Sequence, residues 1–147
     1  MGLQVKNKDD KDSPMKPFEQ IRLPNGLTAE VYDRSRPIAA DTNRVEILIR
    51  IGMALRPDDF AEPSQYEKTC AVFGPEIFFE HQMVQSFVIN KEKEATFRTL
   101  LETFKRNALP YLSTPRFPTQ LAQSRYREIL KNPYKYRILQ DNRTEPA

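Results

Sequence analysis

Residues 45–55 read Val-Glu-Ile-Leu-Ile-Arg-Ile-Gly-Met-Ala-Leu, and every odd-numbered position in this stretch is apolar. Six apolar residues in strict alternation, four of them β-branched, predict a β-strand with one buried face. At about 3.3 Å per residue, a strand over this whole stretch would be about twice the usual length. We therefore expect it to bend at Gly52, to pair with more than one neighbour, or to project beyond its sheet.

A β-hairpin is predicted on the N-terminal side of this strand. Residues 20–23 lead into Pro24-Asn25-Gly26, and residues 27–33 follow with alternating apolar and polar side chains. Asn-Gly favours a type I′ turn, because both central positions of that turn need a positive φ. Pro24 lacks the N–H of a ladder hydrogen bond, which suits the end of a strand.

Two segments near the long strand are expected to be less regular. Residues 34–43 are polar, contain a proline and end in Asp-Thr-Asn, so we interpret them as a connection. Residues 66–73 fit either a short strand or an irregular segment.

Further strands are expected before residue 90. Residues 77–81 and 84–89 are strand candidates because both are rich in aromatic and β-branched side chains, with a break expected near Gln82 and Met83. Residues 18–89 are thus predicted to form about five strands.

The apolar period changes after Asn90, which we expect to be a helix N-cap. Five apolar residues then lie on one face of a helix predicted over about 91–109, which Pro110 limits. They are Phe97, Leu100, Leu101, Phe104 and Ala108. A second helix is predicted over about 118–131. Strands followed by helices indicate an α+β fold with a mainly antiparallel sheet.

The length of 147 residues predicts one domain, placed at residues 18–136. Residues 1–17 are strongly charged and residues 137–147 are polar, so both are predicted to be tails without regular structure. The N-terminal residues have no apolar core of a signal peptide, and no apolar run is long enough to cross a membrane. We therefore expect a cytoplasmic protein.

Several chemistries lack the residues that they need. One cysteine, Cys70, makes no internal disulfide, and one histidine builds no histidine metal cage. The four glycines are scattered, so no phosphate-binding loop is expected. We expect no metal and no cofactor.

Positive charge gathers near the C-terminus. Residues 105–147 carry nine Lys and Arg against three acids, whereas residues 1–104 carry fourteen against seventeen. Within the segment 116–137, cations alternate with aromatic rings, a composition typical of both single-stranded nucleic-acid grooves and protein interfaces. The candidate binding residues of this segment are Arg125, Tyr126, Arg127 and Tyr134. A helix with its basic face in water is the simpler interpretation.

Arg34 and Arg36 flank a serine directly after a predicted strand. Two forked guanidinium groups in one loop suit a phosphate or a carboxylate, and ion pairs with Asp33 and Asp41 are the alternative. The segment resembles the arginine-bearing segment of the PilZ domain, which binds a cyclic dinucleotide on a small β-barrel. The PilZ Arg-x-x-x-Arg and Asp/Asn-x-Ser-x-x-Gly motifs are not found around these arginines, so we do not assign the chain to that family.

Catalytic groups are sparse. Glu76 and Glu80 would share one strand face with His81 on the other, which fits a solvated sheet face better than acid–base chemistry. Cys70 has no third group that would make it a nucleophile, and a small buried thiol is expected. We expect no enzyme.

Three functions remain open. The first is a non-catalytic protein-interaction or regulatory module, with a homodimer through the long strand or the basic helix as one form. The second is nucleic-acid binding through residues 116–137, which no motif supports. The third is an anion or small-ligand site at Arg34 and Arg36.

Overall fold

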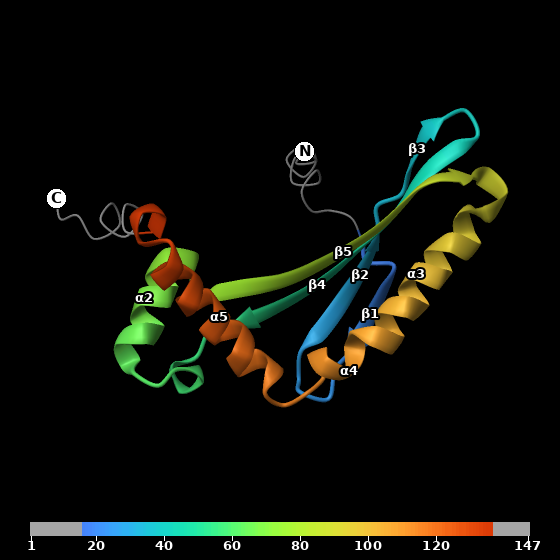
Figure 1. The fold of residues 1–147 in the computed structure, drawn as a ribbon. Helices are drawn as coiled ribbons and strands as arrows, with labels where there is room; N and C mark the ends of the chain where they lie inside the picture. Colours follow the sequence, from blue (N-terminus) through green and yellow to red (C-terminus); the bar gives the residue numbers. More distant parts are fainter. Residues whose placement is uncertain (1–15, 137–147) are drawn as a thin grey trace, which may run out of the picture. The chain divides into compact units, whose positions relative to one another are not determined.

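The structure is a computed structural model that describes residues 16–136. A five-stranded antiparallel sheet combines with helices, so the predicted α+β fold is confirmed (Figure 1). The strands are β1 (Glu19–Arg22), β2 (Thr28–Asp33), β3 (Arg36–Ala39), β4 (Thr42–Ala54) and β5 (Glu76–Ile89). The helices are η1 (Pro57–Asp59), α2 (Pro63–Phe73), η2 (Asn90–Glu92), α3 (Lys93–Asn107), α4 (Leu109–Leu112) and α5 (Phe117–Lys131). The two predicted tails lie outside the described residues, apart from Lys16 and Pro17.

The chain divides into two compact units, which we describe separately. Unit 1 comprises residues 16–22, 28–51 and 80–110. Unit 2 comprises residues 23–27, 52–79 and 111–136. Both β4 and β5 contribute residues to each unit. The single domain over residues 18–136 stays a prediction.

β4 is the central strand of unit 1. Asp33 of β2 lies opposite Ile47, and Arg36 of β3 lies opposite Arg44, so β2 and β3 follow one register along the same edge of β4. β5 also pairs with β4 and therefore occupies the other edge. The expectation that the long strand pairs with more than one neighbour is confirmed.

The connection expected over residues 34–43 is wrong for residues 36–39, which form β3, and for residues 42–43, which begin β4. All four side chains of this short strand are exposed, and Pro37 has no N–H for a ladder. A short edge strand tolerates both features, because one of its edges faces solvent. Polar composition alone therefore did not distinguish an edge strand from a loop.

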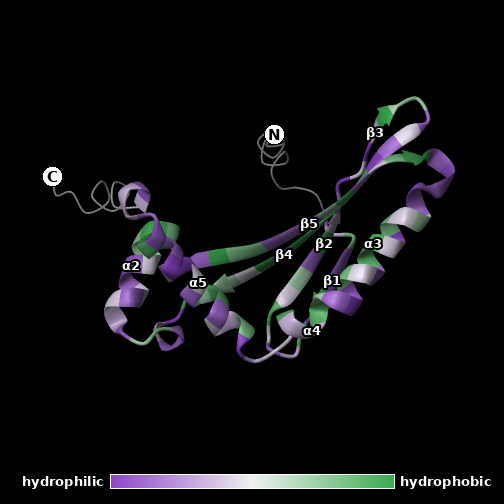
Figure 2. Cartoon of the chain, viewed as in Figure 1, coloured by the Kyte–Doolittle hydropathy of each residue, from purple (hydrophilic) through white to green (hydrophobic). Residues whose placement is uncertain are grey.

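The core of unit 1 lies between the sheet and α3. Val45, Ile47, Ile49 and Ile51 have no exposed surface, as the alternation of the sequence predicts. Phe97, Leu101 and Phe104 of α3 are buried as well, and Figure 1 shows α3 lying along one face of the sheet. Burying each of these large side chains contributes about 1.5–3 kcal/mol. Figure 2 shows the resulting apolar stretch along β4.

The hairpin predicted between β1 and β2 is present, but its turn is not type I′. The Gly26 N–H donates to the Leu23 carbonyl, and the Leu23 N–H donates to the Leu27 carbonyl. Gly26 has a φ of 93°, whereas Asn25 has a negative φ. This is a three-residue loop with a bulge at the glycine. Pro24 favours it, because its fixed φ suits the first central position of a type I turn.

The strand or irregular segment expected over residues 66–73 is wrong, because residues 63–73 form α2 in unit 2. Pro63 begins the helix, where a missing N–H costs nothing, and Gly74 ends it with a φ of 90°. Thr69 and Val72 are buried one turn apart. The helix was missed because its buried face is so narrow.

α5 covers residues 117–131, one residue earlier than predicted, and packs in unit 2. Its buried side chains are Phe117, Leu121, Ala122 and Ile129. Ile129 forms a cluster with Val72 and Tyr136, and Phe73 packs against it. The predicted helix over residues 91–109 is divided into η2, α3 and the start of α4, which includes Pro110.

Two local expectations near β5 are wrong. Residues 76–89 form one continuous strand, with no break at Gln82 and Met83. Asn90 does not cap a helix, since its side chain instead accepts a hydrogen bond from Asn43 over 2.7 Å. No helix within residues 16–136 has the length and apolar character of a membrane span.

Candidate interaction surface

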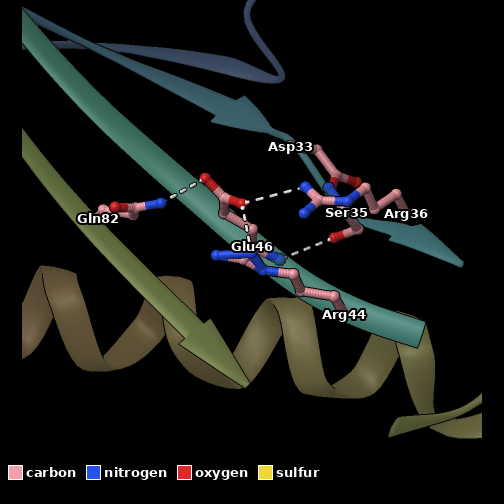
Figure 3. Close-up of polar contacts among 6 residues, drawn as sticks. All are labelled: Asp33, Ser35, Arg36, Arg44, Glu46 and Gln82. Atoms are coloured by element: carbon pink, nitrogen blue, oxygen red, sulfur yellow. Dashed lines mark hydrogen bonds and ion pairs between the residues drawn. The ribbon is translucent and has the colours of Figure 1, made fainter. Parts of the chain in front are cut away.

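The loop after β2 is fixed by hydrogen bonds to itself and to β4. The Ser35 N–H donates to the Asp33 carboxylate over 3.0 Å, and the Ser35 hydroxyl oxygen accepts the Glu46 N–H over 3.1 Å (Figure 3). The Arg34 N–H donates to the Glu46 carbonyl over 2.8 Å. In an uninterrupted strand a backbone carbonyl would accept the Glu46 N–H. Here the side-chain oxygen of Ser35 accepts it instead.

Glu46 is the centre of a polar cluster on the sheet face opposite α3. Its side chain is only 6% exposed and lies 3.4 Å from an Arg44 nitrogen and 3.8 Å from an Arg36 nitrogen. The Gln82 amide of β5 donates to the second carboxylate oxygen over 2.6 Å. Figure 3 shows these side chains converging on Glu46 from β3, β4 and β5. The buried carboxylate thus has two cationic partners and one amide donor, which compensate for its loss of contact with water.

This cluster changes the interpretation of Arg34 and Arg36. Arg36 and Arg44 lie directly opposite each other, and the carboxylate of Glu46 offsets the repulsion of their like charges. Arg36, whose side chain is 62% exposed, therefore forms an ion pair with a partner that the sequence did not indicate. Arg34 is exposed on the same loop. An anion site made by these two arginines stays a prediction.

The C-terminal segment is only partly a surface. Arg125 donates a hydrogen bond to the main-chain carbonyl of Phe78, and its exposure is intermediate. Tyr136 is 5% exposed and donates to Glu128 over 3.1 Å, so it belongs to the core of unit 2. Tyr126 is half-buried.

The outward face of α5 and the residues after it carry the remaining predicted residues. Arg127 is exposed, Leu130 is 54% exposed and Tyr134 is 78% exposed. Arg127 and Leu130 lie one turn apart on α5, whereas Tyr134 follows the end of that helix. Binding through this face stays a prediction.

Two of the residues considered for catalysis, Glu80 and His81, contact other side chains of the fold. Glu80 forms an ion pair with Arg50 at 3.3 Å, and the His81 ring lies 5.9 Å from the Phe104 ring. Cys70 is half-buried on α2, not fully buried as expected. No group of three or more His, Cys, Asp or Glu within residues 16–136 is placed to hold a metal ion.

The most open feature of unit 1 is the outer edge of β5. No strand within residues 16–136 pairs with this edge. Residues 82–89 read Gln-Met-Val-Gln-Ser-Phe-Val-Ile, which contains no charge, proline or glycine. Val84 and Ile89 are 40% and 42% exposed. Unpaired N–H and C=O groups along an uncharged strand are a template for another strand.

The exposed faces of β5 support this interpretation. On β4 every odd-numbered side chain from Val45 to Ile51 is buried, whereas His81 and Gln85 on β5 are exposed. The outer edge of β5 thus has exposed side chains on the face toward α3, and it has no neighbouring strand among the described residues.

Phe87 marks the end of the regular part of β5. It has a φ of 60° and is 78% exposed. Up to Met83, the side chains of β5 that are buried or half-buried are at odd-numbered positions. After Met83, the buried side chain is that of Val88, at an even-numbered position. A positive φ together with a shift of one residue is the signature of a β-bulge. The part of β5 in unit 1 that can form a regular ladder is therefore residues 80–86.

Comparison with known proteins adds no relative, since no family model, no curated protein and no solved structure matches this chain.

The sequence interpretation overlooked the edge of β5, although the uncharged run of residues 82–89 was visible in the sequence. Its position at an edge follows only from the pairing of the strands.

Proposed function

We propose that this chain is a non-catalytic protein-interaction module whose partner is a second copy of the chain. The two copies join edge to edge through β5 and extend the sheet. The observation that carries the proposal is the unpaired, uncharged edge of β5 in unit 1.

A second copy fits this edge by symmetry. When two β5 strands run antiparallel about an axis at Met83, Glu80 faces Ser86 of the other copy and His81 faces Gln85. Gln82 then faces Val84, and Met83 faces itself. No like charges oppose each other in this register, and each pair lies on one face of the sheet. The ladder also ends before the bulge at Phe87.

The symmetry also brings the exposed side chains on the α3 side of β5 to the middle of the dimer. An axis perpendicular to the sheet places the α3 helices of both copies on the same face of the joined sheet. His81 and Gln85, which α3 leaves exposed within one copy, then lie in the middle of the dimer. The long strand β4, considered for dimerisation on sequence grounds, is less suited because both of its edges are paired.

The test measures molar mass by light scattering after size-exclusion chromatography. We expect the unmodified chain to be a dimer at low and high salt, because the ladder is made by uncharged groups. Val84→Lys places a new ammonium group beside the axis in each copy, and we expect it to shift the protein to monomer. Gln20→Lys is the matched control, because Gln20 is exposed on β1 at the opposite edge of the sheet.

A monomer at millimolar concentration would overturn the proposal. A dimer that Val84→Lys leaves intact would overturn the assignment to β5. Amide hydrogen exchange gives a second measurement, since the amides of residues 80–86 should become more protected as the concentration rises. Nucleic acid that leaves the protein only in high salt would instead favour binding through residues 116–137.

A further inference from the structure

Unit 1 contains a cleft of about 290 Å³ between the loop after β2 and the first turns of α3. Its volume lies just below the range of pockets that hold drug-sized ligands, so its occupant must be small. The cleft lies apart from β5, because no residue of that strand lines it. It therefore carries an inference independent of the dimer.

The charged side chains of the cleft are two of each sign. Lys93 and Arg98 supply the positive charges, and Asp33 and Glu94 supply the negative charges. Within residues 16–136, Lys93, Glu94 and Arg98 form no ion pair with each other or with any other group. Lys93, Glu94 and Arg98 are therefore available to a ligand that carries both signs. Asp33 lies beside them, and its carboxylate also accepts the Ser35 N–H.

The remaining lining is aromatic and neutral polar. Phe18 and Phe97 meet edge to face with ring centroids 4.9 Å apart, and Phe18 is 49% exposed. The Ser35 hydroxyl and the side-chain amide nitrogen Nδ2 of Asn90 have no hydrogen-bond acceptor among the described residues. The cleft thus offers an apolar wall beside two free donors.

We propose that this cleft binds a small zwitterion with an apolar side chain, the chemistry of a free amino acid. Lys93 and Arg98, together with the neutral donors, hold the carboxylate. Asp33 and Glu94 hold the ammonium group. The side chain lies against Phe18, where aromatic contact adds to the burial of apolar surface. The sequence pointed to the arginines at 34 and 36 for such a site, whereas the cleft takes its cations from α3.

The test uses three probes of one size in titration calorimetry. L-Phenylalanine carries both charges, 3-phenylpropanoate lacks the ammonium group and phenethylamine lacks the carboxylate. We expect L-phenylalanine to bind at least tenfold more tightly than either analogue, because each lost charge leaves protein charges without a partner. Binding of 3-phenylpropanoate equal to that of L-phenylalanine would overturn the zwitterion in favour of a simple anion site.

Two matched variants place the site. Arg98→Ala removes a cation of the cleft, and Arg106→Ala removes an exposed cation farther along the same helix. We expect the first variant to weaken L-phenylalanine binding at least tenfold and the second to leave it unchanged. Equal effects of the two variants, or no heat from L-phenylalanine up to its solubility, would overturn the proposal. A monomer in the light-scattering test would not, so the two proposals fail separately.

Discussion

The two outer edges of the sheet are built in opposite ways. β1 has four residues, lies between Pro17 and Pro24, and places Glu19 in an ion pair with Lys105 at 3.1 Å. β5 has fourteen residues, the last eight of them uncharged. Short length, proline and charge are the features that keep an edge from pairing with another strand. β1 has all three. On β5 proline and charge are confined to its start, at Pro75, Glu76 and Glu80, and residues 82–89 have neither charge nor proline.

This contrast identifies the end of β5 as the part of the sheet best suited to bind another strand. Exposed apolar side chains occur singly on most proteins and need no explanation. At the end of β5, however, Val84, Phe87 and Ile89 accompany a row of unpaired backbone groups. Figure 2 shows the apolar character of this end of the strand. The bulge at Phe87 limits the length of the ladder and so favours one register over many.

The largest expected effect compares two glutamates on the open face of the sheet. Glu46 holds β3, β4 and β5 together, whereas Glu30 on the β1 side accepts hydrogen bonds from Gln20 and Tyr32. We expect Glu46→Ala to lower the free energy of unfolding by about 2 kcal/mol, because it removes the buried carboxylate that contacts β3 and β5 as well as its own strand. Glu30→Ala, which removes bonds near solvent, should cost about 0.5 kcal/mol. Urea unfolding measures both.

Equal losses for the two glutamates would show that the β5 side of the sheet is held no more tightly than the β1 side. Hydrogen exchange locates the effect, since Glu46→Ala should speed exchange in β5 before it does so in β1. Glu46→Gln serves as the isosteric control, because it keeps the shape but removes the charge that Arg36 and Arg44 share.

A smaller effect concerns the strained backbone at Phe87. In ordinary strand positions glycine is less stable than alanine by about 0.5–1 kcal/mol. A positive φ reverses this order, because only glycine adopts it without strain of about 1–2 kcal/mol. We expect Phe87→Gly to be more stable than Phe87→Ala by roughly 1 kcal/mol, measured by thermal unfolding. The ordinary order of the two variants would mean that this end of β5 carries no strain.

The smallest effect is expected at Tyr32, on the side of β1. Burial raises the pKa of this phenol above its usual value of 10.0, with further contributions from the hydrogen bond and the charge of Glu30, while Arg50 opposes the shift. A raised pKa stabilises the fold below about pH 10, and this contribution is lost as the pH rises through the folded pKa. Tyr32→Phe should therefore lose less stability than the unmodified chain between about pH 9 and pH 11. Urea midpoints at these two pH values measure the difference, and parallel curves would contradict it.

The elements that were predicted correctly are those with a long local period. The strand around Val45, the stripe of α3 and the helix at 117–131 each repeat a pattern over many consecutive residues. α2 was missed because only Thr69 and Val72 of its eleven residues are buried, which leaves too little pattern to recognise. β3 was missed because an exposed edge strand has the composition of a loop. The cleft was missed because its lining comes from three separate segments of the chain.

By itself, the sequence determined which residues would be buried on β4 and α3, because a side chain's face is set by its position in a local repeat. Only the tertiary structure decided that β5 stands at an edge, that Glu46 is enclosed by arginines and a glutamine, and that Tyr136 belongs to a core and not to a binding surface. These outcomes depend on contacts between distant residues, such as Gln82 and Glu46, which are 36 positions apart. No local pattern records which distant side chain meets another, so the surface on which the proposed function rests became visible only when the strands were paired.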